Sequence, residues 1–234
     1  MVTIINNTPL DQYGGGPGVP NDAAGALYAI NASGITDVGG GEYDTTIVGY
    51  PMAWFSSITQ TKYAGTVTSN SVDLSDSIAG YFVSWYQLDI LNSFDFPDYT
   101  TSNAVHWHVQ GNAANGIAGF SYTDNTPWPV VTSLNVPATM SKNSAITITF
   151  STAGTVDFLY CMMYCQGGIK IVHTSSTNAT SVTFSASDVA HMGLTNGQQV
   201  NFQVMPCSLG STTLGGKKYY FAKQSPFSAS ATVQ

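Results

Sequence analysis

The stretch Ile146-Thr-Ile-Thr-Phe150 alternates apolar and polar side chains, and Val200-Asn-Phe-Gln-Val-Met205 repeats that pattern later in the chain. A period of two is typical of a β-strand with one face against a core. Similar runs, separated by small polar turn residues, occur on both sides of these stretches. We therefore expect an all-β protein built of two β-sandwich-like modules.

The second half, residues 128–234, has the rhythm of an immunoglobulin or fibronectin III sandwich, with a turn about every 8–12 residues. We expect its strands at 133–136, 145–150, 156–164, 169–174, 181–184, 200–206, 218–222 and 228–233. Between two of them, Ser185 to Gly193 begins with a capping serine and closes with a glycine, which predicts a helical crossover of about two turns.

The first half divides into a Gly/Pro-rich leader, residues 1–24, and a β domain, residues 25–127. Regular structure is expected to start at Ala26, with further strands at 45–49, 52–58, 63–68, 80–88, 104–109 and 116–122. The segment Asn125-Thr-Pro-Trp-Pro129 favours extended backbone and is the predicted boundary with the second domain, residues 128–234.

Charge is sparse and unevenly placed. Only 8% of the 234 residues are charged, arginine is absent, and the net charge is −7. Residues 1–127 hold eleven acids and one lysine, whereas residues 128–234 hold two acids and five lysines. The lack of cations argues against nucleic-acid binding. The acidic half is suited either to attracting cations or a basic partner, or only to keeping the chain soluble.

Composition also bears on location. A Ser/Thr/Asn-rich chain with few charges is common among secreted and cell-surface β proteins, so we expect an extracytoplasmic protein, on the bacterial cell surface or secreted. No run of 18 apolar residues occurs, which predicts no transmembrane span. Residues 1–24 show no signal peptide, and we expect a mature form whose leader has been removed.

The order of several motifs resembles an uncharacterised family of exported bacterial surface proteins, many of them lipoproteins. The motifs are Tyr63-Ala-Gly-Thr-Val, Val105-His-Trp-His-Val-Gln-Gly111, Gly116-Ile-Ala-Gly-Phe-Ser-Tyr-Thr123, Pro127-Trp-Pro, Val136-Pro, Ser141-Lys, Ala179-Thr-Ser-Val-Thr-Phe-Ser-Ala-Ser-Asp188 and Gly215-Gly-Lys-Lys-Tyr-Tyr-Phe221. The resemblance covers about residues 60–234. It implies an aromatic-rich β part followed by a fibronectin-like domain at the cell surface, and it implies no activity. The lipid-anchoring cysteine of such lipoproteins is absent here.

Two groups of residues are candidate metal ligands. His106 and His108 share one face of a predicted strand, where two imidazoles suit zinc, with Asp95 or Asp98 as a third ligand. Asp89, Asp95 and Asp98 lie in one acidic segment, which suits calcium. The alternatives are exposed histidines beside a core Trp107 and a solvated acidic loop.

The three cysteines allow a disulfide but no obvious metal site. In a strand, Cys161 and Cys165 share a face but lie about 13 Å apart, too far for one metal ion or for a mutual disulfide. A pair between Cys165 and Cys207, both near strand ends, is the disulfide that we expect if one forms.

Aromatic residues are frequent before residue 110. Exposed tryptophan and tyrosine rings serve sugar-binding sandwiches as stacking platforms, which makes Trp85, Tyr99 and Trp107 candidate ligand-binding residues. The alternative is that these rings form the core of the first β domain.

No motif of nucleophile and base, metalloprotease or phosphate loop occurs in the sequence, and we expect a non-catalytic protein. The leading hypothesis is a structural or accessory subunit of an outer-surface assembly, with other envelope proteins or copies of itself as partners. One alternative is a carbohydrate- or ligand-binding module, and a second is a metal-binding protein.

Overall fold

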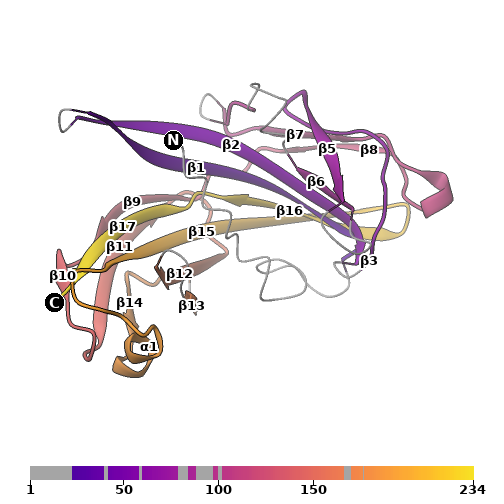
Figure 1. Ribbon diagram of the computed structural model, residues 1–234. Coiled ribbons are helices and arrows are strands. Elements are labelled where there is room, and N and C mark those ends of the chain that lie inside the picture. The colour runs from indigo at the N-terminus through magenta and orange to yellow at the C-terminus, as the bar shows by residue number, and fades with distance from the viewer. Residues whose placement is uncertain are drawn as a thin grey trace. The chain divides into compact units, whose positions relative to one another are not determined.

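The computed structural model describes residues 23–39, 42–57, 60–78, 84–87, 97–99, 102–165, 170–175 and 177–234. The protein is all-β, as the sequence predicts, with one short α-helix among the described residues (Figure 1). The chain forms two compact units. Unit 1 contains the chain up to Pro127 together with Leu209–Lys223, and unit 2 contains Trp128–Ser208 together with Gln224–Gln234.

This division corrects the predicted domains in one respect. The predicted boundary after Pro127 coincides with the first passage of the chain between the units. Residues 209–223, however, belong to unit 1 although they come from the second half of the sequence. The chain therefore passes between the units three times, after Pro127, Ser208 and Lys223.

Unit 1 is built on a series of hydrogen-bonded strands. Their order is β16-β1-β2-β6-β5-β4-β7-β8, with β3 paired to β2. The bounds are β1 Gly25–Gly39, β2 Glu42–Ser57, β3 Gln60–Thr61, β4 Val67–Ser69, β5 Val72–Ile78, β6 Ser84–Gln87, β7 Val105–Val109, β8 Phe120–Asp124 and β16 Lys217–Gln224. Strand β1 starts within one residue of the predicted position.

The core of unit 1 brings the two ends of this strand order together. The Phe120 ring of β8 lies 4.9 Å from that of Tyr219 in β16, and the Tyr122 ring stacks on Phe221 at 3.7 Å. Because β8 and β16 stand at opposite ends of the order, these contacts show that the sheet folds back on itself. Residues 26–30 of β1 are buried on both strand faces, which explains their continuous apolar sequence.

Two strands expected in unit 1 begin later than predicted. The strand expected at 63–68 starts only at Val67, because Gly65 has a φ of +78° and interrupts the extended backbone. The strand expected at 116–122 starts at Phe120, because Ala113–Asn115 form a 3₁₀ turn that ends at Gly116 with a φ of +68°. Glycine's wide conformational range hides such breaks from strand patterns.

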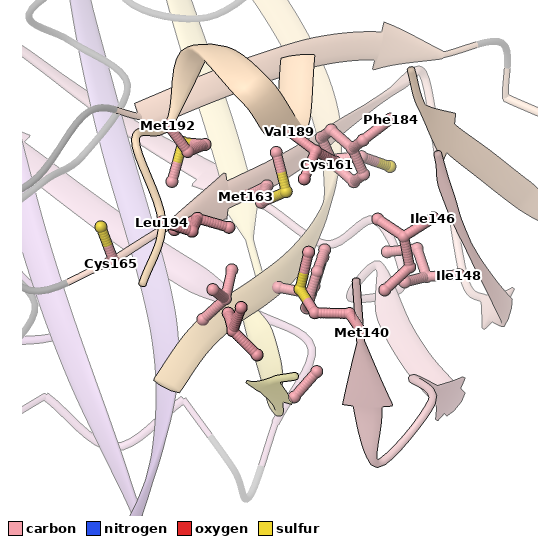
Figure 2. Packing of buried hydrophobic residues seen from close by; sticks show 14 of the residues in the cluster. Met140, Ile146, Ile148, Cys161, Met163, Cys165, Phe184, Val189, Met192 and Leu194 are labelled. Atoms are coloured by element: carbon pink, nitrogen blue, oxygen red, sulfur yellow. The ribbon is translucent and has the colours of Figure 1, made fainter. Parts of the chain in front are cut away.

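Unit 2 consists of two sheets packed face to face. The strand order is β14-β11-β9 in one sheet and β10-β17-β15-β12-β13 in the other. The bounds are β9 Val130–Asn135, β10 Thr139–Met140, β11 Ile146–Ala153, β12 Phe158–Tyr164, β13 Lys170–Ser175, β14 Ser181–Phe184, helix α1 Ala186–His191, β15 Gln199–Leu214 and β17 Phe227–Val233. Figure 2 shows the buried core, to which the sulfur-containing residues Met140, Cys161, Met163 and Met192 contribute.

Local predictions hold well in unit 2. Strand β11 alternates buried and exposed residues from Ile146 to Phe150, as its sequence predicts. Strand β14 has the predicted bounds. Helix α1 is also confirmed: Ser185 caps it, and Asp188 completes a capping box with the Ser185 main chain.

Strands β15 and β16 form a long hairpin whose residues belong partly to unit 2 and partly to unit 1. Strand β15 is followed by the Gly215-Gly216 turn, in which both glycines have positive φ, and then by the neighbouring strand β16. The base of β15 pairs with β17, from Gln199 opposite Thr232 to Val204 opposite Phe227. The base of the hairpin thus belongs to unit 2 and its tip, residues 209–223, to unit 1. No helix among the described residues has the length and hydropathy to cross a membrane.

Candidate functional site: a polar sheet face and a basic depression in unit 1

Strand β7 presents both of its histidines to solvent. Val105, Trp107 and Val109 are buried, whereas His106 and His108 are exposed, so the expected face-sharing of the two imidazoles is confirmed. The Nδ1 atom of His106 lies 3.0 Å from the Thr123 hydroxyl of β8. The Nδ1 atom of His108 lies 3.1 Å from the Ser121 hydroxyl of the same strand.

The surroundings of this histidine pair are polar. Thr68 of β4 stands opposite His108, and Asp73 of β5 stands opposite Thr68, so the two β strands extend the row of polar residues. Asn70 accepts a hydrogen bond from the His106 main-chain N–H at 2.8 Å. Among the described residues, no three His, Cys, Asp or Glu side chains come together as a metal site.

Of the acidic residues expected as further ligands, only Asp98 is among the described residues. Asp98 is exposed, and its carbonyl oxygen accepts a hydrogen bond from the Asn70 amide at 3.1 Å. Asp89 and Asp95 lie outside the described residues. The calcium site expected from these three carboxylates and the third zinc ligand therefore stay predictions.

The prediction that Tyr99 and Trp107 form a stacking platform for a sugar is wrong, because both rings are buried. Only 2% of Tyr99 and 2% of Trp107 is exposed, so neither ring offers a face to a ligand. The Tyr99 hydroxyl lies 2.5 Å from the buried Ser69 hydroxyl, and burial raises the pKa of Tyr99. Both rings are core residues, as the alternative interpretation holds. The side chain of Trp85 lies outside the description.

The Cys165–Cys207 pair, which we expect if a disulfide forms, is not present among the described residues. All three cysteines are free and buried. Cys207 stands opposite Phe158 at one end of β12, while Cys165 follows the other end of that strand. Seven residues of strand separate them along β12, which is about 23 Å, far beyond the reach of a disulfide. Burial raises the pKa of Cys161 to about 12, so this thiol is a poor metal ligand at neutral pH.

A second feature of unit 1 is a depression of about 340 Å³. Two lysines, two polar side chains and two apolar residues contribute to its lining: Lys62, Lys217, Ser56, Asn115, Ile117 and Tyr219. Among the described residues, no carboxylate side chain lines it. Burial raises the pKa of Tyr219, so its phenol stays neutral at physiological pH.

Sequence reasoning did not find this depression. Lys62 comes from the first half of the chain, and Lys217 comes from the tip of the β15–β16 hairpin, 155 residues later in the numbering. The sequence predicts a strand at 218–222, and nothing in it links the preceding Lys217 to Lys62. The two lysines line one depression because residues 209–223 fold as part of unit 1.

Comparison with known proteins adds no family to these observations. No family model matches the chain, and a search of curated proteins finds none that is similar to it.

Proposed function

We propose that this chain is a non-catalytic protein of the bacterial cell surface, a structural or accessory subunit of an extracytoplasmic assembly. The observation that carries the proposal is the shared hairpin, because the chain passes between the units three times. Units joined by one linker separate easily. Here, separation also requires that strands of the 209–223 tip leave the sheet of unit 1, which suits a subunit that must stay intact within an assembly.

Composition and strand order support the same assignment. Few charges and many Ser, Thr and Asn residues are common in exported β proteins. The three-stranded sheet β14-β11-β9, facing a sheet with β12, β15 and β17, supports an immunoglobulin- or fibronectin-like identity for unit 2. The motif order that resembles exported bacterial surface proteins agrees with this location.

The test is the native mass of the protein isolated from its own cells, together with identification of co-purifying chains. We expect a stable complex with envelope proteins or a defined homo-oligomer that survives gentle extraction. Light scattering gives the mass, and mass spectrometry identifies the partners. A lone monomer without envelope partners contradicts the proposal.

A second candidate function is metal binding at His106 and His108. The observation in its favour is the hydroxyl group beside each Nδ1, at 3.0 and 3.1 Å. When these hydroxyls accept Nδ1–H, both Nε2 lone pairs are left for a metal, an arrangement common around metal-bound histidines. Two imidazoles in a strand at positions i and i+2 suit Zn²⁺ or Cu²⁺.

Zinc titration by calorimetry tests this second function. We expect one weak zinc site that is lost in His106→Gln and in His108→Gln. His191→Gln is the matched control, because His191 is exposed at the end of α1 in unit 2. Equal zinc binding by all four proteins excludes the site.

A further inference from the structure

We propose that a zinc ion bound at His106 and His108 joins two copies of this chain, to which each copy contributes its two exposed imidazoles. The inference rests on the metal site described above as the second candidate function, and it adds the partner that completes the site. This partner is a second copy of the chain, which meets the first through the exposed face of strand β7.

Both imidazoles are held in the same way. His106 stands opposite Thr123 of β8, and His108 stands opposite Ser121. Each Nδ1 atom lies beside the hydroxyl of the residue opposite, at 3.0 Å for His106 and 3.1 Å for His108. The two histidines are two residues apart, so their Cα atoms are separated by about 6.6–6.8 Å along β7. With Nδ1–H donating to the hydroxyl, the Nε2 atom of each ring is the metal ligand.

One copy offers zinc two of the four ligands that close a tetrahedral shell. Thr68 of β4 and Ser121 of β8 flank His108 on the two neighbouring strands, and both carry hydroxyls, whereas zinc sites use thiolate, imidazole and carboxylate groups. The carboxylate in the same row, Asp73, stands two strands from β7, about 9.4–9.8 Å away between main chains. Within the part of the chain that the structure describes, no third His, Cys, Asp or Glu joins the pair.

The histidine pair is accessible to a second copy. His106 and His108 are exposed, and so are their hydroxyl partners Ser121 and Thr123. Serine and threonine are shorter than histidine, so the two imidazole rings stand above the side chains beside them. When the same face of a second copy approaches about a two-fold axis, its pair meets this pair. Four Nε2 atoms then surround one zinc ion, and the tetrahedral shell is complete.

The charges beside the histidine pair favour the contact once zinc is bound. The side chains that stand opposite the two histidines on β4 and β8 carry hydroxyl groups and no charge. Asp73 of β5 adds a negative charge in the row of His108, and this charge attracts a divalent cation. Two copies bring two such carboxylates, whose repulsion the zinc ion between the faces offsets.

Light scattering of the full chain during a titration with zinc chloride tests the bridge. We expect the mass to rise from the 24.7 kDa of one chain to twice that value at half an equivalent of zinc per chain. In excess zinc, each chain binds its own ion with two imidazoles and water, so the mass should fall again by mass action. Removal of zinc with EDTA should also restore the single-chain mass.

Substitutions of the two histidines locate the bridge. His106→Gln and His108→Gln should each abolish the zinc-dependent doubling of mass. His191→Gln, at the exposed end of α1 in unit 2, is the matched control and should double in mass as the wild type does. Circular dichroism verifies that each variant is folded. Doubling that persists in both β7 variants overturns the bridge.

Calorimetry run in parallel separates the bridge from the metal site on which it rests. Half an equivalent of zinc bound per chain, together with the doubled mass, supports the bridge. One equivalent bound per chain with the mass unchanged leaves the metal site standing and overturns the bridge. If the wild type binds no zinc, the metal site and the bridge are both refuted.

Discussion

The ammonium of Lys223 lies 3.3 Å from the carboxylate of Asp124, and both side chains are buried in unit 1, with 1% and 4% exposed. The ammonium also donates to the carbonyl oxygens of Asn103 at 2.7 Å, Asp124 at 3.1 Å and Thr126 at 2.7 Å. Thr126 precedes the first passage of the chain between the units, and Lys223 precedes the last. The Lys223 side chain therefore ties together, within unit 1, the two chain segments that lead into the first and the last passage to unit 2.

Loss of either charge should destabilise unit 1. In Lys223→Met, the Asp124 carboxylate loses its counter-charge and three carbonyl oxygens lose a donor. Breaking a buried pair costs about 3–5 kcal/mol, because an uncompensated charge stays in the interior. We expect the free energy of unfolding, measured with urea, to fall by this amount.

The double variant Lys223→Met with Asp124→Leu separates pairing from packing. It removes both buried charges, so we expect it to be more stable than either single variant. Simple addition of the two single losses would show that the pair is not coupled. Burial lowers the pKa of Lys223, and the charge and hydrogen bond of Asp124 raise it again in part.

The shared hairpin predicts how fragments fold. Residues 23–127 alone lack β16 and with it the ring contacts of Tyr219 and Phe221 with Phe120. We expect this fragment to show no cooperative thermal transition by circular dichroism. Joining residues 209–223 to its C-terminus through a Gly/Ser linker should restore one. A cooperative transition in the fragment without the hairpin contradicts the assignment of residues 209–223 to unit 1.

The free cysteines predict the chemistry of the thiols. Because all three are buried, we expect slow reaction with Ellman's reagent in the native protein and release of three equivalents in guanidinium chloride. Intact mass without reductant should correspond to three thiols. A mass lower by two hydrogens would reveal a disulfide that the strand register excludes.

Alkaline pH should weaken unit 2. The pKa of Cys161 rises from 9.0 to about 12 on folding because burial disfavours the thiolate. The folded state then binds more protons than the unfolded state above pH 9, so this contribution to stability is complete below pH 9 and is lost as pH rises toward 12. We expect the unfolding free energy of Cys161→Val to fall less steeply with pH over this window.

The cap of α1 predicts the opposite dependence at acid pH. Hydrogen bonds from Ser185 lower the pKa of Asp188 below 3.8, so its contribution is present above pH 3.8 and is lost as pH falls through the lowered pKa. Ser185→Ala should cost about 1 kcal/mol at pH 7, measured by urea unfolding. Ser187→Ala, at an exposed position in the helix, serves as the control and should change little.

The sequence by itself determines the features of this protein that depend on residues close together in the chain. Alternation predicts β7 and β11, and the serine cap with its closing glycine predicts α1. Two prolines around Trp128 predict the first passage between the units. Each depends on backbone geometry over a few residues, which holds in any tertiary setting.

Only the tertiary structure decides which distant segments meet. It places Tyr99 and Trp107 in the core, because burial depends on what covers a ring and not on the ring itself. It separates Cys165 from Cys207 through the register of β12 with β15. The tip of the hairpin lies in unit 1 because its aromatic rings complete a core that residues 23–127 leave open. The placement of residues 209–223 in unit 1 brings Lys217 to the depression that Lys62 also lines, and it brings Lys223 to Asp124. No sequence pattern within residues 23–127 or within residues 209–223 predicts these two pairings.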